Sequence, residues 1–317
     1  MKKNKLISAA LITSAAVGTI YAINKTISFI ANSKATLSNS KALRYEWRFG
    51  NIFYTKQGEG KPILLVHDLT CGSSDMEWKS IVNTYAKKHT VYTIDLLGCG
   101  RSDKPSLTYT NYMYVQLITD FIKNIIGHRT DVVATGASAA TILMACYNDD
   151  TLFDKIMLIN PVSFEAVSSN KRDAKIYKFL LELPILGTLI YNINNTRQSY
   201  NELFKNKYFY NPYAVRASLV KNYYDASHFG PSSSKYLFAS INANYTSINT
   251  SRALKAINNS IYVIAGEFEA DMREIVADYQ ELNPSIEVAT IKDTKHLPQL
   301  ENPSEVLNAM SIFFNYT

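Results

Sequence analysis

The stretch "DVVATGASAATILMACY", residues 131–147, holds a strand, a tight turn and a helix in immediate succession. Its first five residues form a short apolar run, which is typical of a strand buried on both faces of a sheet. Small residues follow, and "AATILMACY" then has the composition of a buried helix. A strand that passes through a short turn into a helix is the repeating unit of an α/β sheet.

The same alternation of strands and helices continues on both sides of this stretch. Short apolar runs predict further strands at residues 63–66, 91–94, 155–160, 260–266 and 286–291. Periodicity predicts helices at residues 78–88, 114–126 and 303–314. Two alternating strands that reverse at Gly50 precede them. The pattern predicts a mostly parallel central sheet with helices on both faces.

One long segment interrupts the rhythm. Residues 163–250 contain no clear buried strand and are rich in helical and aromatic stretches. We interpret them as a helical cap insertion over the carboxyl ends of the strands, where ligands bind in sheets of this kind. The chain is accordingly divided into residues 1–41 and a folded α/β domain at residues 42–317.

Composition narrows the class of protein. The chain has 317 residues, of which 47% are hydrophobic and 19% charged, as in a folded globular protein. The net charge of +6 is small, and the sequence contains no recognisable nucleic-acid-binding motif, so nucleic acid is not expected as a partner. Three widely spaced cysteines lack metal-ligand spacing, and we expect neither a metal site nor a cofactor.

The N-terminus differs from the rest of the chain. Three lysines within residues 2–5 precede an uncharged apolar run at residues 6–23, which is long enough to span a bilayer as a helix. No A-x-A cleavage site follows, which favours an uncleaved single-pass anchor in the cell membrane. The lysines favour a cytoplasmic N-terminus with the folded domain outside the cytoplasm. The alternative is a signal peptide, with secretion after cleavage.

Ser138 lies between the predicted strand and helix of the opening stretch, where a nucleophile elbow would lie. Gly136 and Ala140 supply the small residues that so tight a turn requires two positions before and after the serine. The N–H of Ala139, at the start of the helix, would then face a developing oxyanion. The alternative is that Ser138 is one more small residue in an alanine-rich helix.

A serine nucleophile needs a base and a carboxylate that orients it. His296 lies in the loop after the last predicted strand, so it can meet a serine at another strand end. Glu267, Glu269 and Asp271 follow the strand at residues 260–266. The order serine, acid, histidine is the one expected for a hydrolase of this type.

Five motifs carry a family resemblance over roughly residues 45–314. They are "PILLVHDL" at 62–69, "DLLGCGRSDKP" at 95–105, "ATGASAA" at 134–140, "IAGEFEAD" at 264–271 and "KHLPQLENP" at 295–303. The chain resembles the α/β-hydrolase superfamily, in the capped group of esterases, epoxide hydrolases, haloperoxidases and C–C hydrolases. The second motif matches the family's D-x-x-G-x-G-x-S loop. The resemblance implies an α/β-hydrolase fold.

The resemblance also implies roles for individual residues. Ser138 would be the nucleophile, His296 the base and Glu269 the acid, with Asp271 as the fallback. The N–H groups of Leu69 and Ala139 would form the oxyanion hole. Together with the predicted N-terminal anchor and the aromatic-rich cap, these roles predict a membrane-anchored serine hydrolase acting on a small apolar ester or related carbonyl compound. A serine nucleophile argues against epoxide and dehalogenase chemistry, in which an aspartate occupies the elbow.

Departures from the family pattern motivate a second hypothesis. Asp68 follows His67 where the family has glycine, and it places a negative charge near a developing negative charge. Ala140, Glu269 and Lys295 also replace the commoner residues. The alternative function is a catalytically impaired α/β-hydrolase-fold protein that binds a ligand or partner. For the active form we expect Ser138 Oγ about 2.6–3.2 Å from the His296 ring, with Asp68 close to the same pocket.

Overall fold

The computed structural model describes residues 2–33, 43–165, 172–230 and 233–314. Its sheet has eight strands in the order β1-β2-β4-β3-β5-β6-β7-β8. The strands are β1 Leu43–Trp47, β2 Gly50–Gln57, β3 Lys61–Val66, β4 His89–Ile94, β5 Thr130–Thr135, β6 Phe153–Ile159, β7 Ile261–Gly266 and β8 Glu287–Ile291. β2 pairs antiparallel with β1 and β4, and the other neighbours are parallel. The predicted fold class is confirmed.

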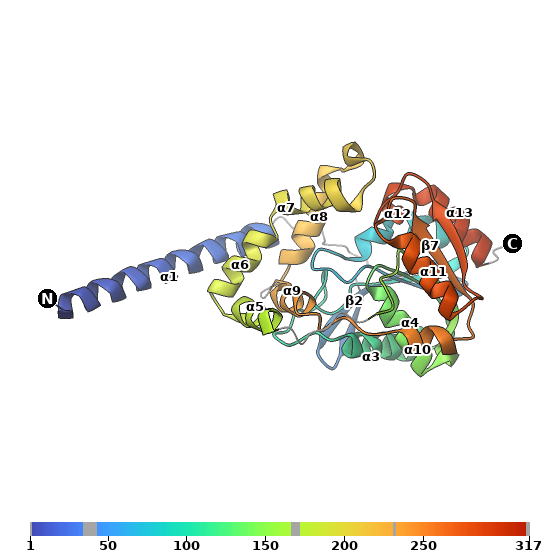
Figure 1. The fold of residues 1–317 in the computed structure, drawn as a ribbon, viewed down its shortest axis with the longest axis horizontal. Helices are drawn as coiled ribbons and strands as arrows, with labels where there is room; N and C mark the ends of the chain where they lie inside the picture. The colour runs from blue at the N-terminus through green and yellow to red at the C-terminus, as the bar shows by residue number, and fades with distance from the viewer. Residues whose placement is uncertain (1, 34–42, 166–171, 231–232, 315–317) are drawn as a thin grey trace.

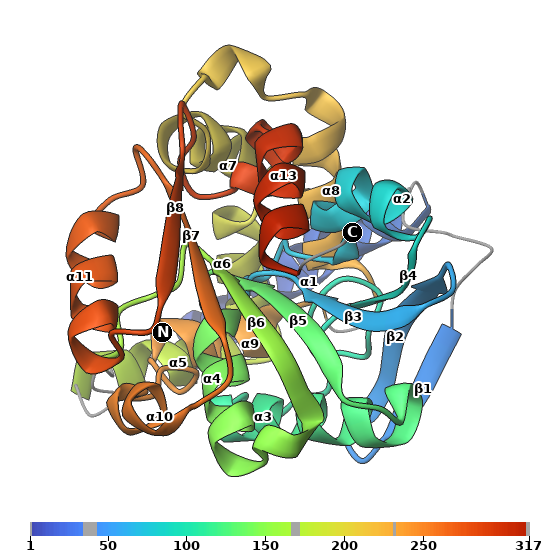
Figure 2. The same ribbon diagram turned by 90° about the vertical axis from the view of Figure 1, so that its right-hand side faces the viewer.

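Helices cover both faces of the sheet (Figure 2). One face carries α2 Lys79–Tyr85 and α13 Pro303–Phe313, and the other carries α3 Asn111–Phe121, α4 Ser138–Asn148, α10 Ser251–Ala256 and α11 Met272–Leu282. Alternate residues of the central strand β5 pack into the helical layers on opposite faces of the sheet. Val132 packs into the α3–α4 side and Val133 into the α2–α13 side. This alternation follows from the two-residue period of a strand and explains why β5 is apolar throughout.

Between β6 and α10, the residues that the structure describes form helices joined by turns and loops, with no strand. The elements of this segment are α5 Arg172–Glu182, α6 Leu186–Asn194, α7 Arg197–Leu203, the π-helical turn η4 Phe204–Tyr208, the 3₁₀ turn η5 Pro212–Ala214, α8 Ala217–His228 and α9 Lys235–Asn242. We call this segment the cap. Buried Tyr200, Phe204 and Tyr223 of the cap pack against Leu297, in the loop after β8. The cap thus touches the edge of the sheet at which the parallel strands end.

The remaining elements are short or stand apart from the sheet. They are η1 Asp75–Trp78, η2 Ile122–Ile126, η3 Asp150–Leu152, α12 Pro298–Glu301 and the long N-terminal helix α1 Lys2–Ser33. Most of α1 projects away from the body of the protein (Figure 1). Near its end, Asn24 donates a 3.0 Å hydrogen bond to the Ile185 carbonyl and accepts a 2.9 Å bond from Asn192. These buried bonds fix the end of α1 on α6.

No individual helix in the described ranges is both long and apolar enough to cross a bilayer. By length and composition, α5 and α6 pass that test only as a pair, bent by 105°. The expected N-terminal anchor stays a prediction, and so do the domain boundaries at residues 1–41 and 42–317.

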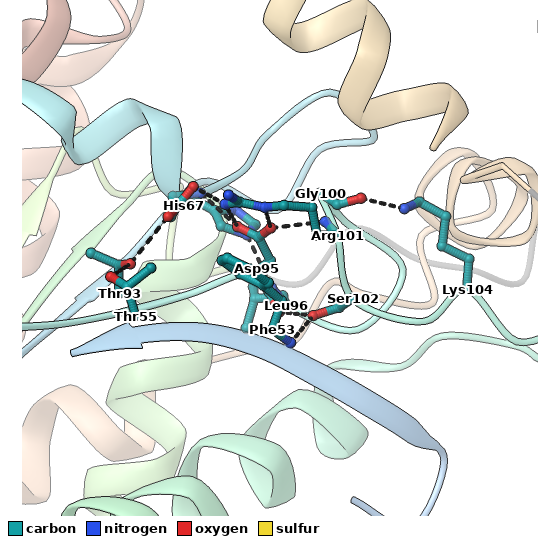
Figure 3. A network of polar contacts seen from close by, with 11 residues as sticks. Phe53, Thr55, His67, Thr93, Asp95, Leu96, Gly100, Arg101, Ser102 and Lys104 are labelled. Atoms are coloured by element: carbon teal, nitrogen blue, oxygen red, sulfur yellow. Dashed lines mark hydrogen bonds and ion pairs between the residues drawn. The ribbon is translucent and has the colours of Figure 1, made fainter. Parts of the chain in front are cut away.

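A buried ion pair organises the loop after β4 (Figure 3). Arg101 Nε donates to Asp95 Oδ2 at 2.9 Å, and the Arg101 backbone N–H donates to the same oxygen at 2.8 Å. Arg101 also pairs with Asp75. Gly100 has φ +49°, and a Cβ there would lie 2.2 Å from Asp95 Oδ2, so only glycine fits. These contacts explain the D-x-x-G-x-G-x-S pattern as a structural motif.

His67 connects this loop to the end of β3 (Figure 3). The Leu96 N–H donates to His67 Nε2 at 3.0 Å, so that nitrogen is an acceptor. The other ring nitrogen, Nδ1, lies 2.6 Å from the Asp68 carbonyl and therefore carries the proton. Burial lowers the pKa of His67, which agrees with a neutral ring. The ring thereby fixes the backbone at Asp68.

Replacing Arg101 with methionine should destabilise the fold strongly. The substitution leaves the buried Asp95 carboxylate without its cation, and breaking such a pair costs about 3–5 kcal/mol. Urea unfolding measures the effect. The matched control is Arg48→Gln, which breaks the largely exposed pair with Asp120 and should cost less than about 1 kcal/mol. Equal losses in the two variants would contradict the role given to Arg101.

Candidate active site

The turn after β5 differs from the expected one by two residues. The strained position, with φ +57°, is Gly136, and Ser138 is already the first residue of α4 with no positive φ. Ser138 is fully buried, and its hydroxyl donates a 2.6 Å hydrogen bond to the His67 carbonyl. A nucleophile elbow presents its nucleophile at the strained residue. In this chain that residue is a glycine, which carries no side chain.

The carboxylate of Asp68 occupies the space that a side chain at residue 136 would need. A Cβ on Gly136 would lie 2.2 Å from Asp68 Oδ1. That oxygen accepts hydrogen bonds from the N–H groups of Leu69 at 2.7 Å and Ala137 at 2.8 Å. An oxyanion hole in this fold is made by the N–H after the elbow residue and one from the loop after β3. The Asp68 carboxylate therefore fills the oxyanion hole.

The second oxygen of Asp68 faces the predicted base. His296 Nε2 lies 3.0 Å from Asp68 Oδ2, and His296 Nδ1 lies 2.8 Å from Glu269 Oε1. The three residues follow β3, β8 and β7, whose ends meet at one edge of the sheet. The carboxylate beside Nδ1 is that of Glu269, whereas Asp271 is exposed and precedes α11. The result is an imidazole held between two carboxylates.

This geometry corrects two expectations. Ser138 was expected to hydrogen-bond to His296, but the two ring nitrogens bond to Asp68 and Glu269 instead. Ala139 was expected to supply an oxyanion-hole N–H, but its N–H donates to the Gly136 carbonyl at 3.2 Å. Both errors have one cause. The turn that starts at Gly136 places the serine inside the helix and gives the oxyanion role to Ala137.

Proximity sets the ionisation of Asp68 and His296. Burial alone would lower the pKa of His296, but the hydrogen bonds and charges of Asp68 and Glu269 raise it to about 10. Burial alone would raise the pKa of Asp68. The imidazolium and the two N–H groups hold it below its usual range. At neutral pH the His296 ring is therefore an imidazolium ion paired with the Asp68 carboxylate.

Aromatic side chains close the site. The Tyr208 ring, from η4 of the cap, stacks on the His296 ring with centroids 4.5 Å apart. Asp68 is only 4% exposed. Beneath it, Glu77 accepts hydrogen bonds from the Asp68 N–H at 3.2 Å and from the Tyr223 hydroxyl at 2.7 Å. Burial and the nearby Asp68 charge raise the pKa of Glu77 to about 7.

Sequence reasoning did not assign roles to Gly136 as the strained residue, or to Glu77 and Tyr208. Gly136 comes directly after a buried strand, in a chain that has few glycines. A glycine in such a place favours a positive φ, so the sequence did contain a signal for this residue. No local pattern marks Glu77 or Tyr208. Over the residues that the structure describes, no set of His, Cys, Asp and Glu side chains is arranged to hold a metal ion.

The chain is similar in part to a curated hydrolase. It is 30% identical over 98 residues to 2-hydroxy-6-oxo-6-(2'-aminophenyl)hexa-2,4-dienoic acid hydrolase of Metapseudomonas resinovorans. The match covers 29% of this chain and 34% of the relative, so it spans about a third of that protein's length. A further relative, the uncharacterized protein Rv2715 of Mycobacterium tuberculosis, is 28% identical over 32% of this chain and 30% of its own length.

Solved structures share the fold at low sequence identity. The serine hydrolase CarC, involved in carbazole degradation, superposes with a TM-score of 0.71 at 17% identity, over 86% of this chain and 98% of its own. The epoxide hydrolase CorEH gives a TM-score of 0.71 at 16% identity with the same two coverages. A membrane phospholipase A gives 0.66 at 15% identity, over 99% of this chain and 98% of its own.

A family model extends the likeness over most of the chain. The model described as the alpha/beta hydrolase family matches residues 63–309, from β3 to α13. That range contains the elbow, the filled oxyanion hole and the histidine between its two carboxylates. The chain therefore belongs to the alpha/beta hydrolase family.

Proposed function

We propose that this protein is a hydrolase whose nucleophile is the carboxylate of Asp68, with His296 and Glu269 as its proton-transfer pair. The observation that carries the proposal is the position of Asp68. Its Oδ1 lies between the two N–H groups of the oxyanion hole, and its Oδ2 lies against His296 Nε2. A carboxylate from the loop after β3 thus stands where an elbow side chain would stand.

The filled oxyanion hole indicates which bond is attacked. Attack on an ester carbonyl develops negative charge on the substrate's carbonyl oxygen, and that oxygen needs two free N–H donors. Here both donors are bonded to Asp68. Displacement at a saturated carbon needs no such donors on the substrate. We therefore propose a small epoxide as the substrate class, in place of the ester implied by a serine nucleophile.

In the first step Asp68 Oδ2 attacks an epoxide carbon, and the carbon–oxygen bond of the ring breaks. The His296 imidazolium gives its Nε2 proton to the oxygen that leaves the carbon. The product of this step is a hydroxyalkyl ester of Asp68 beside a neutral imidazole. An epoxide oxygen suits the site because it must take up one proton, and His296 holds one at neutral pH.

In the second step the neutral His296 removes a proton from water, which attacks Cγ of the Asp68 ester. The charge that develops on Oδ1 is stabilised by the N–H groups of Leu69 and Ala137. When the intermediate collapses, the leaving alkoxide takes the proton of the newly formed carboxylic acid group, which releases a diol and restores the Asp68 carboxylate beside the imidazolium. Esterification of Asp68 removes one of the charges that raise the pKa of His296, so the ring is a competent base only in this step.

The closed site requires that substrate entry displace part of the cap. Tyr208 covers the His296 ring, and it belongs to the short π-helical turn η4. An epoxide hydrolase is among the structural neighbours, which shows that this fold can house such chemistry. The apolar and aromatic surroundings of the site, including Phe204 and Leu297, favour an aryl or alkyl substituent on the epoxide.

Asp68→Asn should lower the turnover of styrene oxide by about 10⁴-fold, because the amide is not a nucleophile. Ser138→Ala is the matched control and should retain activity. In a single turnover in ¹⁸O-water, mass spectrometry should find the label in the Asp68 peptide and not in the first diol released. Loss of activity in Ser138→Ala, with fluorophosphonate labelling of Ser138 in the wild type, would establish the serine route instead. No turnover and no labelling would favour the ligand-binding alternative.

His296 should remain protonated well above the usual histidine range. The raised pKa means that the ion pairs stabilise the fold fully below about pH 6.5 and that this contribution is lost as the pH rises through about 10. NMR titration of the ring ¹³C signals measures the pKa directly. In Asp68→Asn the pKa should fall, because one carboxylate is lost. A wild-type titration near pH 6.5 would contradict the proposed resting state.

We also propose that α1 attaches the protein to the cell membrane, with the hydrolase body outside the cytoplasm. The support is that α1 projects from the body (Figure 1). Its apolar residues Val17, Tyr21 and Ile23 are exposed. The alignment with the membrane phospholipase A covers 99% of this chain, which includes this segment. The alternative is secretion after cleavage of the segment.

The full chain, expressed in bacteria, should stay in the membrane pellet after an alkaline carbonate wash. Deletion of residues 2–20 should release it, because this removes most of the apolar run but keeps the Asn24 hydrogen bonds that fix α1 to the cap. Protease treatment of intact cells tests the orientation. Recovery of the full chain in the carbonate supernatant would contradict the anchor, and a shortened N-terminus in the medium would favour secretion.

A further inference from the structure

A cavity of about 280 Å³ lies between the end of α1 and the cap, apart from His296 and Asp68. Its walls come from α1, α6, α9 and the segments that lead into these cap helices, with Ser106 of the loop after β4 and His228 at the end of α8. The volume corresponds to several water molecules at about 30 Å³ each, which suits a small polar group. The Asn24 hydrogen bonds hold the α1 wall in place. The cavity therefore exists only while α1 is seated on the cap.

The charge in this cavity is positive. Lys25 of α1 and Lys235 of α9 line it, and none of the described lining residues is an aspartate or glutamate. Lys235 is 3% exposed, and burial lowers its pKa. The nearby carboxylate is Glu182, which acts on Lys235 electrostatically but pairs with Lys178. The Lys235 ammonium donates hydrogen bonds to the Leu183 carbonyl at 3.1 Å and to Thr188 Oγ1 at 3.3 Å, and these neutral partners leave its charge to be balanced by an anion.

Two helix ends add to this field. Pro184 and Ile185 directly precede α6, and Ser233 lies just before the cap residue of α9. The amino ends of both helices therefore meet the cavity, and each carries partial positive charge and backbone N–H groups that suit anions. The Thr188 hydroxyl donates to the Pro184 carbonyl at 2.6 Å and accepts a hydrogen bond from Lys235 Nζ at 3.3 Å, so it positions the lysine. The two lysines and the two helix ends converge on the cavity from three helices.

We propose that the cavity between α1 and the cap binds a phosphate group, either free or carried by a lipid headgroup. Phosphate offers several acceptor oxygens, so it can bond two lysines and helix-end N–H groups at once. The cavity begins at Tyr21, beside the end of the apolar run at residues 6–23. This site is independent of the hydrolytic chemistry proposed above.

The full chain in detergent should bind inorganic phosphate saturably by isothermal titration calorimetry. Lys235→Gln should weaken binding by about tenfold or more, because a hydrogen bond to a charged group is lost. Lys25→Gln should weaken it in the same direction, and this exposed position does not endanger folding. The matched control is Lys292→Gln, an exposed lysine after β8, which should leave binding unchanged.

The source of the phosphate is distinguished with vesicles. Phosphatidylcholine vesicles with phosphatidic acid are compared with vesicles that carry the same charge as oleate, so that insertion of α1 contributes equally. A lysine-dependent preference for phosphatidic acid assigns the site to a lipid headgroup, whereas lysine-dependent binding of inorganic phosphate alone assigns it to a free ligand. The proposal is overturned if wild type and the Lys25 and Lys235 variants bind both probes alike, or if the wild type binds neither.

Discussion

The contact between the Asp68 carboxylate and the backbone turn at Gly136 determines the chemistry of this site. Two N–H groups and an imidazolium surround the carboxylate and hold it ionised although it is buried. That arrangement requires a residue without a side chain at the elbow, since any Cβ would overlap Oδ1. The position of His296, the occupied oxyanion hole and the displaced serine all follow from this requirement.

A series of contacts, first between charged groups and then between neutral ones, holds Asp68 in place. The Arg101–Asp95 pair fixes the loop after β4, and that loop donates a backbone N–H to the His67 ring. His67 Nδ1 in turn donates a hydrogen bond to the Asp68 carbonyl, and the His67 carbonyl accepts one from the Ser138 hydroxyl. The Ser138 hydroxyl is thus bonded to the backbone and takes no part in the proposed reaction. The D-x-x-G-x-G-x-S loop thus acts on the site through a backbone hydrogen bond to His67.

Much of the architecture could be predicted from the sequence, because strands such as residues 131–135 are short, apolar and followed by small residues. The order of residues at strand ends offered Glu267, Glu269 and Asp271 as partners of His296, and the family resemblance singled out Glu269, which is hydrogen-bonded to the ring. The elbow could not be placed to within two residues, since Gly136 and Ser138 both fit a small-x-small pattern and only φ separates them. Tyr208 reaches His296 from the cap, and no local pattern encodes so distant a contact.

Asp68 and any side chain at residue 136 would clash, and this clash constrains how such a site can change. A serine introduced at 136 would collide with Asp68. Under the proposed mechanism, a glycine introduced at 68 would remove the nucleophile, whereas the two changes together would restore an ordinary elbow. The two positions are therefore coupled, and a change at one requires a change at the other.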